Sequence, residues 1–377
     1  VMTIQRHILT DVESGIHLDD YQLGGDHRQG GGDATEWSIS KRTLRGGLSD
    51  GVDVVAVDNG VLRFELLPTR GMGLWRGQCH GVPLGWRSPV RLPVHPAQVN
   101  LASANGFGWL RGFNEWMCRC GLESFGDPAL DQDAGGGQQQ LTLHGRIANL
   151  PAHYVSVEVA QGDVDRLTVR GIVDEAALFG PKLRLDSRIR TDAGSNALEI
   201  VDQTTNASDE PGELQLLYHA NFGAGLLEEG AQIVAAVSEV APYDQHSAAS
   251  IERWHDCEGP THGFVEQCYF LRPIADDQGT ASILLRNAQA DRAVHLSFDV
   301  QELPYLTIWK FFVGLNDGYV LGLEPGTSYP NPKPLEREQG RVIPLAPGET
   351  YRTSLRMEIL GNAQEVARQE AAIRQRP

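Results

Sequence analysis

Apolar and polar residues alternate with a period of two along much of the chain, which is the pattern of half-buried β-strands. Residues 51–68 form two such runs that meet at Asp58-Asn59-Gly60, and an Asn-Gly pair between alternating runs favours a tight hairpin. Turns rich in Gly, Asp, Asn and Pro separate further runs at intervals of roughly a dozen residues, as in antiparallel sandwiches and barrels. These further predicted strands cover residues 153–160, 165–174, 182–191, 197–206, 213–222, 265–271, 281–286, 292–300, 305–312, 318–324 and 351–360.

Helical periodicity is convincing only over residues 362–376, and the segment 127–140 is rich in Gly, Gln and Asp, which predicts an exposed loop. The sequence contains neither a linker between independently folding halves nor a clean repeat. We therefore expect an all-β fold class, a large antiparallel β-sandwich formed as a single domain by residues 1–377. Residues 1–50 would add N-terminal strands or an extension, and a short C-terminal helix would dock on the sheet. The apolar face predicted for that helix carries Ala363, Val366, Ala367 and Ala371.

Composition narrows the choice of partners. The chain has 377 residues with 41% hydrophobic content, which is ample for a packed core, and a formal net charge of −17. No block of Lys and Arg stands out from this acidic background. We therefore expect neither nucleic acid nor an anionic membrane surface as a partner.

The cysteines indicate neither a disulfide framework nor a structural metal site. There are five, an odd number, and Cys118 and Cys120 are too close together for a typical zinc knuckle. The first residues lack the continuous apolar segment of a signal peptide, and no run of 18 apolar residues occurs. These features predict a cytoplasmic protein in a reducing compartment, without a membrane-spanning segment.

A histidine interrupts the apolar strand predicted at residues 213–222. The period of two gives that strand one apolar face and one face that becomes polar toward its end. The first face should lie in the core, and the second should border a polar site. The apolar face carries Leu214, Leu216, Tyr218 and Ala220, and the other face carries Gln215, Leu217, His219 and Asn221.

A second strand, at residues 318–324, ends in a similar way. Tyr319, Leu321 and Leu323 share one face, and the other ends with Gly322 and Glu324. A strand glycine often marks the place where a ligand approaches the backbone. The histidine and the glutamate at these two strand ends are a candidate acid and base. Spacing alone leaves open a simpler alternative, a hydrogen-bonded strand histidine and an ordinary glutamate at the sheet rim.

Three further segments place polar or aromatic side chains beside glycines: residues 65–75, 106–126 and 141–154. Aromatic faces bind the apolar C–H side of a sugar ring, while Arg, Asn and Glu side chains bind its hydroxyls. Each segment could also be purely structural, but together they predict a polar pocket on a β-sandwich. The candidates for contacts in such a pocket are Arg70, Trp109, Arg111, Asn114, His144, Arg146 and Asn149.

Six motifs between about residue 60 and residue 332 share their order with one known family. They are LLPTRGMGLWRGQCHGVPLGWRSP, GWLRGF, CGLESFG, LHGRIANLPA, LYHANFG and LGLEPGTSYPNP. In these motifs the chain resembles the galactose mutarotase (aldose 1-epimerase) superfamily, and most closely its branch of unknown function. The resemblance implies a galactose mutarotase-like β-supersandwich that binds a sugar on its open face.

The resemblance also implies roles for individual residues. It makes His219 the general acid and Glu324 the general base, with His144 as a further histidine of the sugar site. Glu266 would bind sugar hydroxyls, and Arg70 would line the site. The sequence departs from the family pattern beside the acid, where Tyr218 replaces the usual Asn and Asn221 the usual Tyr, and the segment after the base differs as well. These changes leave the acid–base pair intact and put the usual sugar preference in doubt.

Basic residues in or beside the motifs suggest contacts to the substrate, because guanidinium forks bind paired hydroxyls as readily as carboxylates. We expect at least one arginine to touch the sugar, with Arg70 as the first choice. The alternative is that two or more of these residues belong to the ordinary surface. The basic candidates are Arg70, Arg111, Arg146 and Lys310, and Asn221 and Glu266 complete the binding set.

The implied function is aldose 1-epimerase activity on a small carbohydrate, without a metal or organic cofactor, in a monomer or homodimer. The carboxylate would take the anomeric proton while the imidazolium protonates the ring oxygen, from opposite sides of one pocket, and His144 would stabilise charge or hold the substrate. One alternative is an isomerase, epimerase or lyase acting on a modified sugar, and another is a non-catalytic sugar-binding protein. A metal hydrolase using His144, His153 and His219 is disfavoured, because no two of these histidines have short ligand spacing.

Overall fold

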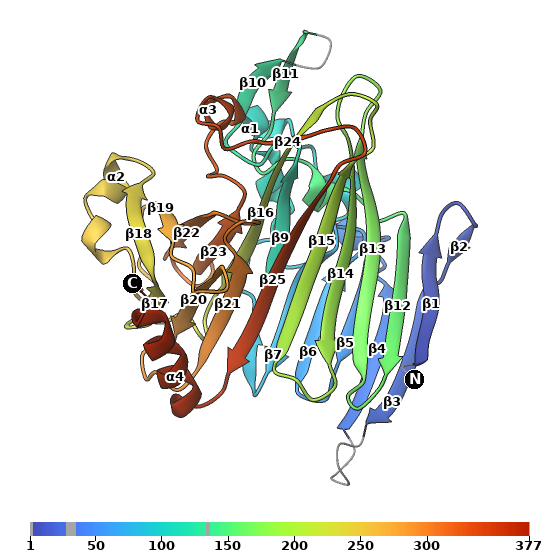
Figure 1. The fold of residues 1–377 in the computed structure, drawn as a ribbon, viewed down its shortest axis with the longest axis horizontal. Coiled ribbons are helices and arrows are strands. Elements are labelled where there is room, and N and C mark those ends of the chain that lie inside the picture. Colours follow the sequence, from blue (N-terminus) through green and yellow to red (C-terminus); the bar gives the residue numbers. More distant parts are fainter. Residues whose placement is uncertain (1–2, 28–34, 133–135, 377) are drawn as a thin grey trace.

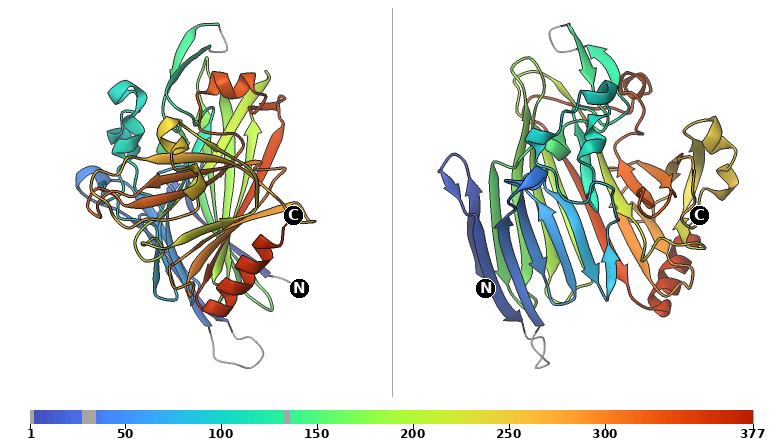
Figure 2. Two further views of the ribbon diagram at one scale, coloured as in Figure 1. Left: turned by 90° about the vertical axis from the view of Figure 1, so that its left-hand side faces the viewer. Right: turned by 180° about the vertical axis from the view of Figure 1, so that it is seen from behind.

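The computed structural model describes residues 3–27, 35–132 and 136–376, and it consists of two large β-sheets packed against each other (Figure 1). The strands pair antiparallel throughout both sheets, as the short turns between alternating runs predict. The N-terminal strands lie at one edge of the molecule and the C-terminal helix lies near the other (Figures 1 and 2). The predicted all-β sandwich is confirmed.

One sheet has ten strands. Several of them are long alternating segments from the middle of the chain. In spatial order its strands are β17 (Gln232–Ala235), β20 (Thr280–Arg286), β21 (Ala293–Asp299), β25 (Thr350–Leu360), β15 (Ala197–Asn206), β14 (Lys182–Asp192), β13 (Arg166–Ala176), β12 (Tyr154–Gln161), β1 (Thr3–Asp11) and β2 (Ile16–His17).

The other sheet has thirteen strands and carries the candidate acid and base. In order they are β18 (Val237–Pro242), β19 (Gln267–Pro273), β22 (Tyr305–Phe311), β23 (Val320–Gly326), β16 (Gly212–Phe222), β9 (Met117–Leu122), β7 (Gly73–Cys79), β6 (Leu62–Leu67), β5 (Asp53–Asp58), β4 (Thr35–Thr43) and β3 (Asp20–His27), with β8 (Val82–Leu84) beside β7 and β24 (Ile343–Leu345) beside β16.

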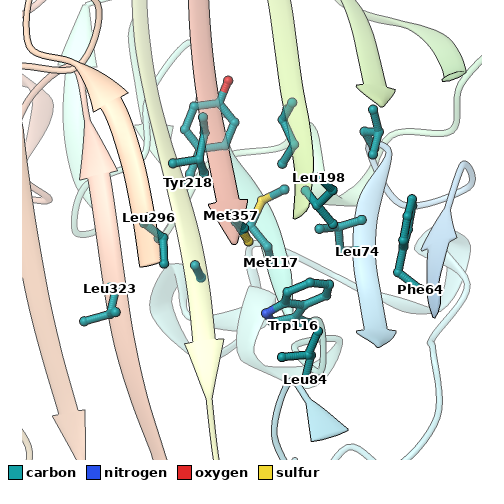
Figure 3. Packing of buried hydrophobic residues seen from close by; sticks show 14 of the residues in the cluster. Phe64, Leu74, Leu84, Trp116, Met117, Leu198, Tyr218, Leu296, Leu323 and Met357 are labelled. Atoms are coloured by element: carbon teal, nitrogen blue, oxygen red, sulfur yellow. The ribbon is translucent and has the colours of Figure 1, made fainter. Parts of the chain in front are cut away.

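The hydrophobic core fills the space between the two sheets (Figure 3). Tyr218 and Leu323 enter it from the thirteen-stranded sheet, and Leu198, Leu296 and Met357 enter it from the ten-stranded sheet. The apolar faces predicted for β16 and β23 are therefore the core faces. It follows that the other face of each strand points away from the sandwich interior.

A buried ion pair joins the sheets inside this core. Arg119 on β9 meets Asp202 on β15, with Nε 2.5 Å from Oδ2 and Nη2 3.0 Å from Oδ1. Arg119 also donates to the Ser187 hydroxyl and to two backbone carbonyls just before β7, so all five of its N–H groups have acceptors. The Tyr218 hydroxyl donates to the same carboxylate over 2.7 Å. The cluster is stable because its charges and donors are all paired.

Residues 127–140 differ from the predicted loop. Ala129–Gln132 (β10) and Gln138–Leu141 (β11) pair as an antiparallel hairpin, and residues 133–135 lie outside the described part of the chain. Asp131 forms an ion pair with Arg337 of α3 (Lys333–Glu338), which anchors the hairpin. The alternation is hidden in the sequence because most of the hairpin's side chains are polar and do not pack into the core.

The predicted terminal helix is present as α4 (Ala363–Arg374), and the Asn362 side chain caps it by accepting a hydrogen bond from the backbone N–H of Glu365. Its buried face agrees with the predicted one only at Val366, and the other side chain that reaches the sheet is Ile373, which the prediction left out. The predicted alanines Ala363, Ala367 and Ala371 are exposed. In the described ranges, no helix has the length and apolar character needed to span a membrane.

We expect Asp202→Asn to lower the free energy of unfolding by about 3–5 kcal/mol, because it leaves the Arg119 cation buried without a counter-charge. The control is Asp192→Asn, which removes one partner of the largely exposed Arg166–Asp192 pair and should cost no more than about 1 kcal/mol. Chemical denaturation measures both values. Equal losses in the two variants would show that the buried pair does not stabilise the fold.

Candidate active site

The strand register brings the predicted acid and base together. In the antiparallel pairing of β16 with β23, Ala220 lies opposite Leu323 and Asn221 opposite Gly322. The same register places His219 opposite Glu324, and His219 Nε2 lies 3.3 Å from Glu324 Oε1. The expectation that they stand on opposite sides of a pocket is wrong, since cross-strand neighbours project side by side from one face.

A cavity of about 190 Å³ opens over this pair. Aromatic rings form much of its lining, from Trp109 in a 3₁₀ turn, Phe113 in the following loop and Trp309 on β22. The His219 ring lies 5.0 Å from the Phe113 ring and 5.5 Å from the Trp309 ring, measured between centroids. The apolar rings surround both titratable groups and exclude water from them.

His144 completes the inner wall. Its ring packs 4.4 Å from that of Trp109 and meets His219 edge-on at 5.2 Å. Burial lowers the pKa of His144 to about 4, so this ring is neutral near neutral pH. Its Nδ1 atom has no hydrogen-bond partner within the described residues. His144 can therefore bind a substrate hydroxyl, but it brings no positive charge.

Burial also acts on the central pair. It lowers the pKa of His219 well below the usual value of an imidazole, and it raises the pKa of Glu324 well above the usual value of a carboxyl. Both shifts have the same cause, since desolvation disfavours the charged form of each group. Carboxyl groups far more accessible than this pair surround the mouth, from Asp127, Asp244 and Glu266. Among described residues, the cavity lining includes neither Lys nor Arg.

Arg70 is not part of this lining, which corrects the expectation that it touches the substrate. It is fully buried, and its Nε donates to Glu115 Oε1 over 2.6 Å. Its other N–H groups bind Asn149 Oδ1 at 3.0 Å and the backbone carbonyls of Val94 and Gly112. Arg70 and Asn149 thus hold the loops behind the aromatic wall, and neither reaches the cavity.

Lys310 does not line the cavity either, so the prediction that it contacts the substrate is wrong. Thr307 and Trp309 of β22 line the cavity, and the period of two turns Lys310 to the opposite face. There its Nζ donates to the backbone carbonyls of Arg253 and Asp256, and burial lowers its pKa to about 8. Lys310 therefore secures the segment after α2 (Gln245–Ala248).

The remaining polar candidates divide by position. Trp109 and Glu266 line the cavity, as predicted, and Glu266 Oε2 accepts a hydrogen bond from the indole of Trp309. Arg111 and Arg146 are exposed and lie outside it. Asn114 is buried outside the cavity, with neither side-chain amide atom paired to a described residue. Asn221 lies beneath the cavity and contacts His219 rather than the open space.

Several residues that line the cavity were not predicted from the sequence. Thr307 stands directly opposite Glu324 across the β22–β23 pairing, and its hydroxyl has no partner among described residues. The alternation of residues 305–312 and their hairpin link to the next strand could have revealed both Thr307 and Trp309. The rim pair of Tyr243 and Asp127, with a 2.6 Å hydrogen bond, joins segments distant in sequence, and no local pattern marks it.

The described residues contain no group of three or more His, Cys, Asp or Glu side chains placed to hold a metal ion. His153 of the alternative metal site does not line the cavity. It precedes β12, and its Nε2 atom lies 3.2 Å from Asp174 Oδ2 on β13. The arrangement that the structure does provide is a buried acid–base pair under aromatic rings. Such a pair can transfer protons to and from a bound molecule.

The family profile described as “Domain of unknown function (DUF4432)” matches residues 49–359. The chain belongs to this family. This DUF4432 protein is similar to a crystal structure from Klebsiella pneumoniae, provisionally described as an aldose 1-epimerase, with 36% identity and a TM-score of 0.93. The match covers 99% of this chain and 96% of the other.

More distant structures share the fold. A galactose mutarotase-like protein from Clostridium acetobutylicum is 15% identical with a TM-score of 0.57, covering 86% of this chain and 98% of its own. An Escherichia coli protein, also provisionally described as an aldose 1-epimerase, is 15% identical with a TM-score of 0.52, over 82% and 99% of the two chains. No curated protein matches the chain significantly. The DUF4432 chain thus has the galactose mutarotase-like fold.

We expect Gly322→Ala to break the His219–Glu324 contact without unfolding the DUF4432 protein. A Cβ at position 322 would overlap Glu324 Oε1 and lie 3.3 Å from the Cβ of Trp309, so the carboxyl must turn away. A crystal structure of the variant should show the Nε2–Oε1 separation beyond the ion-pair limit of about 4 Å. Gly24→Ala is the control, because a Cβ at that strand position meets only ordinary contacts. An unchanged separation would contradict the steric role of Gly322.

Proposed function

We propose that the protein is an aldose 1-epimerase-like enzyme that interconverts the anomers of a monosaccharide through His219 and Glu324. The observation that carries the proposal is the contact between these two side chains, buried beneath a cavity lined with aromatic rings. The similarity to the Klebsiella pneumoniae protein, which is provisionally described as such an enzyme, supports it. The resemblance of six sequence motifs to the mutarotase superfamily supports it independently of the geometry.

The side-by-side placement suits the chemistry of anomer exchange. A base removes the proton of the anomeric hydroxyl while an acid protonates the ring oxygen, the C1–O5 bond breaks, and C1=O1 forms. Both oxygens are bonded to the same carbon, so the acid and the base must lie close together. C1 then rotates, and closure by the reverse proton transfers gives the other anomer. In this reaction Glu324 serves as the base and His219 as the acid during ring opening, and the roles reverse during closure.

The other lining residues would bind and orient the ring. Trp109, Phe113 and Trp309 offer faces for the C–H side of a sugar, and the unpaired Thr307 hydroxyl and neutral His144 offer hydrogen bonds. The carboxyl groups at the mouth would accept hydrogen bonds from sugar hydroxyls. Since cationic side chains are lacking from the described lining, an uncharged sugar fits this site better than a sugar phosphate or uronate.

The decisive test is anomer exchange, followed by NMR across a panel of monosaccharides. Glu324→Gln keeps the shape of the side chain and removes the base, so the exchange rate constant should fall by about 10²–10⁴-fold. The control is Glu338→Gln, which makes the same change at an exposed position of α3 and should retain the parent rate. If Glu324→Gln stayed within a few-fold of the parent on a sugar that the parent exchanges, Glu324 would have no part in catalysis. Sugar binding without exchange by the parent would favour a non-catalytic binding protein.

The charge of the site predicts its selectivity. We expect an aldose to bind at least about tenfold more tightly than its 6-phosphate or its uronate, because the carboxyl groups around the mouth repel an anion. Isothermal titration calorimetry with the three compounds measures the difference. Glu266→Gln should reduce the discrimination, because it removes one exposed carboxylate from the mouth. Tighter binding of either anionic sugar would contradict an uncharged substrate.

A further inference from the structure

We infer that Asn221 is a positioning residue that confines the exchangeable proton of His219 to Nε2, the ring nitrogen that faces Glu324. The kinetic consequence of this inference rests on the proposed function, whereas the location of the proton does not. The sequence suggests Asn221 as a sugar contact, whereas in the structure it lies beneath the His219–Glu324 pair.

The hydrogen bonds of Asn221 fix the orientation of its amide. The Nδ2 atom donates to the backbone carbonyl of Glu115 over 3.0 Å and to that of His219 over 2.9 Å. A carbonyl oxygen can only accept, so both acceptors require the NH₂ end of the amide on their side. The Oδ1 atom must then be the end that meets the histidine ring, at 2.7 Å from His219 Nδ1.

This orientation decides which ring nitrogen carries the fixed proton. Oδ1 of an amide has no proton to give, so His219 Nδ1 must be the donor of the 2.7 Å hydrogen bond. That requirement holds for both the neutral ring and the imidazolium, and it excludes only the tautomer with a bare Nδ1. The proton that His219 gains or loses is therefore the one on Nε2. Nε2 is the atom that lies 3.3 Å from Glu324 Oε1.

The surroundings allow the pair to carry one mobile proton in total, either on His219 Nε2 or on Glu324. His144 faces His219 from the neighbouring loop and is neutral, and burial raises the pKa of the Cys118 and Cys268 thiols, so they remain uncharged. The carboxyl groups of Asp127, Asp244 and Glu266 lie at the wetter mouth, and the Arg70–Glu115 ion pair lies behind the wall. No cation other than His219 itself is placed in the described lining to hold Glu324 ionised.

Burial then favours the uncharged form of both groups, with a bare Nε2 on His219 and the proton on Glu324. Moving that one proton to Nε2 gives the imidazolium–carboxylate form that begins ring opening. In each half of the reaction, one group takes a proton from the sugar while the other gives one. The total number of protons on the pair is therefore unchanged. An uncharged acceptor such as Asn221 stabilises the imidazolium less than a carboxylate would, so it leaves the preference for the uncharged pair largely in place.

The first test needs no sugar. In ¹⁵N-histidine NMR of the whole protein, His219 should show a protonated Nδ1 at every pH at which the fold persists, with titration confined to Nε2. Asn221→Leu removes the acceptor, and the ring should then populate the Nε2–H tautomer. A parent protein with a bare Nδ1 would overturn the inference, and this result does not depend on whether any sugar is exchanged.

The second test uses the pH profile of anomer exchange. Asn221→Asp places a carboxylate against Nδ1–H and stabilises the imidazolium, so the pair takes up its second proton at a higher pH. The acid limb of kcat/KM should move up by about 1–3 pH units. Asn316→Asp, the same change on an exposed loop, should leave the limb in place.

The two tests separate the possible failures. If the Asn221→Asp variant folds and still exchanges anomers, but the acid limb of its kcat/KM profile stays in place, the kinetic role of Asn221 is overturned. A parent that exchanges no sugar, but shows the expected ¹⁵N signature, would refute the proposed enzyme and leave the proton assignment standing. Should Asn221→Asp fail to fold, the ¹⁵N spectrum of the parent still decides the assignment.

Discussion

The site depends above all on the antiparallel register between β16 and β23. That register sets His219 across from Glu324 on the face of the sheet that does not enter the sandwich. The other face of β16 enters the core, where the Tyr218 hydroxyl binds the carboxylate paired with Arg119. Consecutive residues of one strand therefore belong to two different networks, one that joins the two sheets and one that forms the buried His219–Glu324 pair. A slip of a single residue would exchange the two and destroy both.

Local alternation in the sequence was sufficient to predict most strands and the faces of the two that matter most. His219 and Glu324 could be identified because each interrupts an apolar pattern near the end of a strand. The contact between them could not, since it depends on which strands become neighbours. The resemblance to a known family suggested the roles expected of them, yet only the register shows that the two side chains stand side by side.

The predictions that the structure corrects failed for more than one physical reason. In the sequence, Arg70 is a charged residue beside two glycines. This pattern is equally compatible with a ligand contact and with a buried structural ion pair. Its actual partner, Glu115, comes from 45 residues further along the chain and is brought to it only by folding. Lys310 differs, because the alternation of its strand already separates it from Thr307 and Trp309. The face of α4 was misjudged in a related way, since alanines contribute little apolar area and Val366 and Ile373 determine which side docks.

The residues of the site come from two kinds of backbone, interior strands and the connections between strands. His219 and Glu324 stand on strands paired on both sides, whereas Trp109, Phe113 and Tyr243 come from connections between strands. Connections tolerate insertion, deletion and exchange of residues far better than interior strands do. Natural variation can therefore reshape the rim of the cavity while His219 and Glu324 stay where they are. Under the proposed function, such a scaffold is suited to diversification, with one reaction carried out on many substrates.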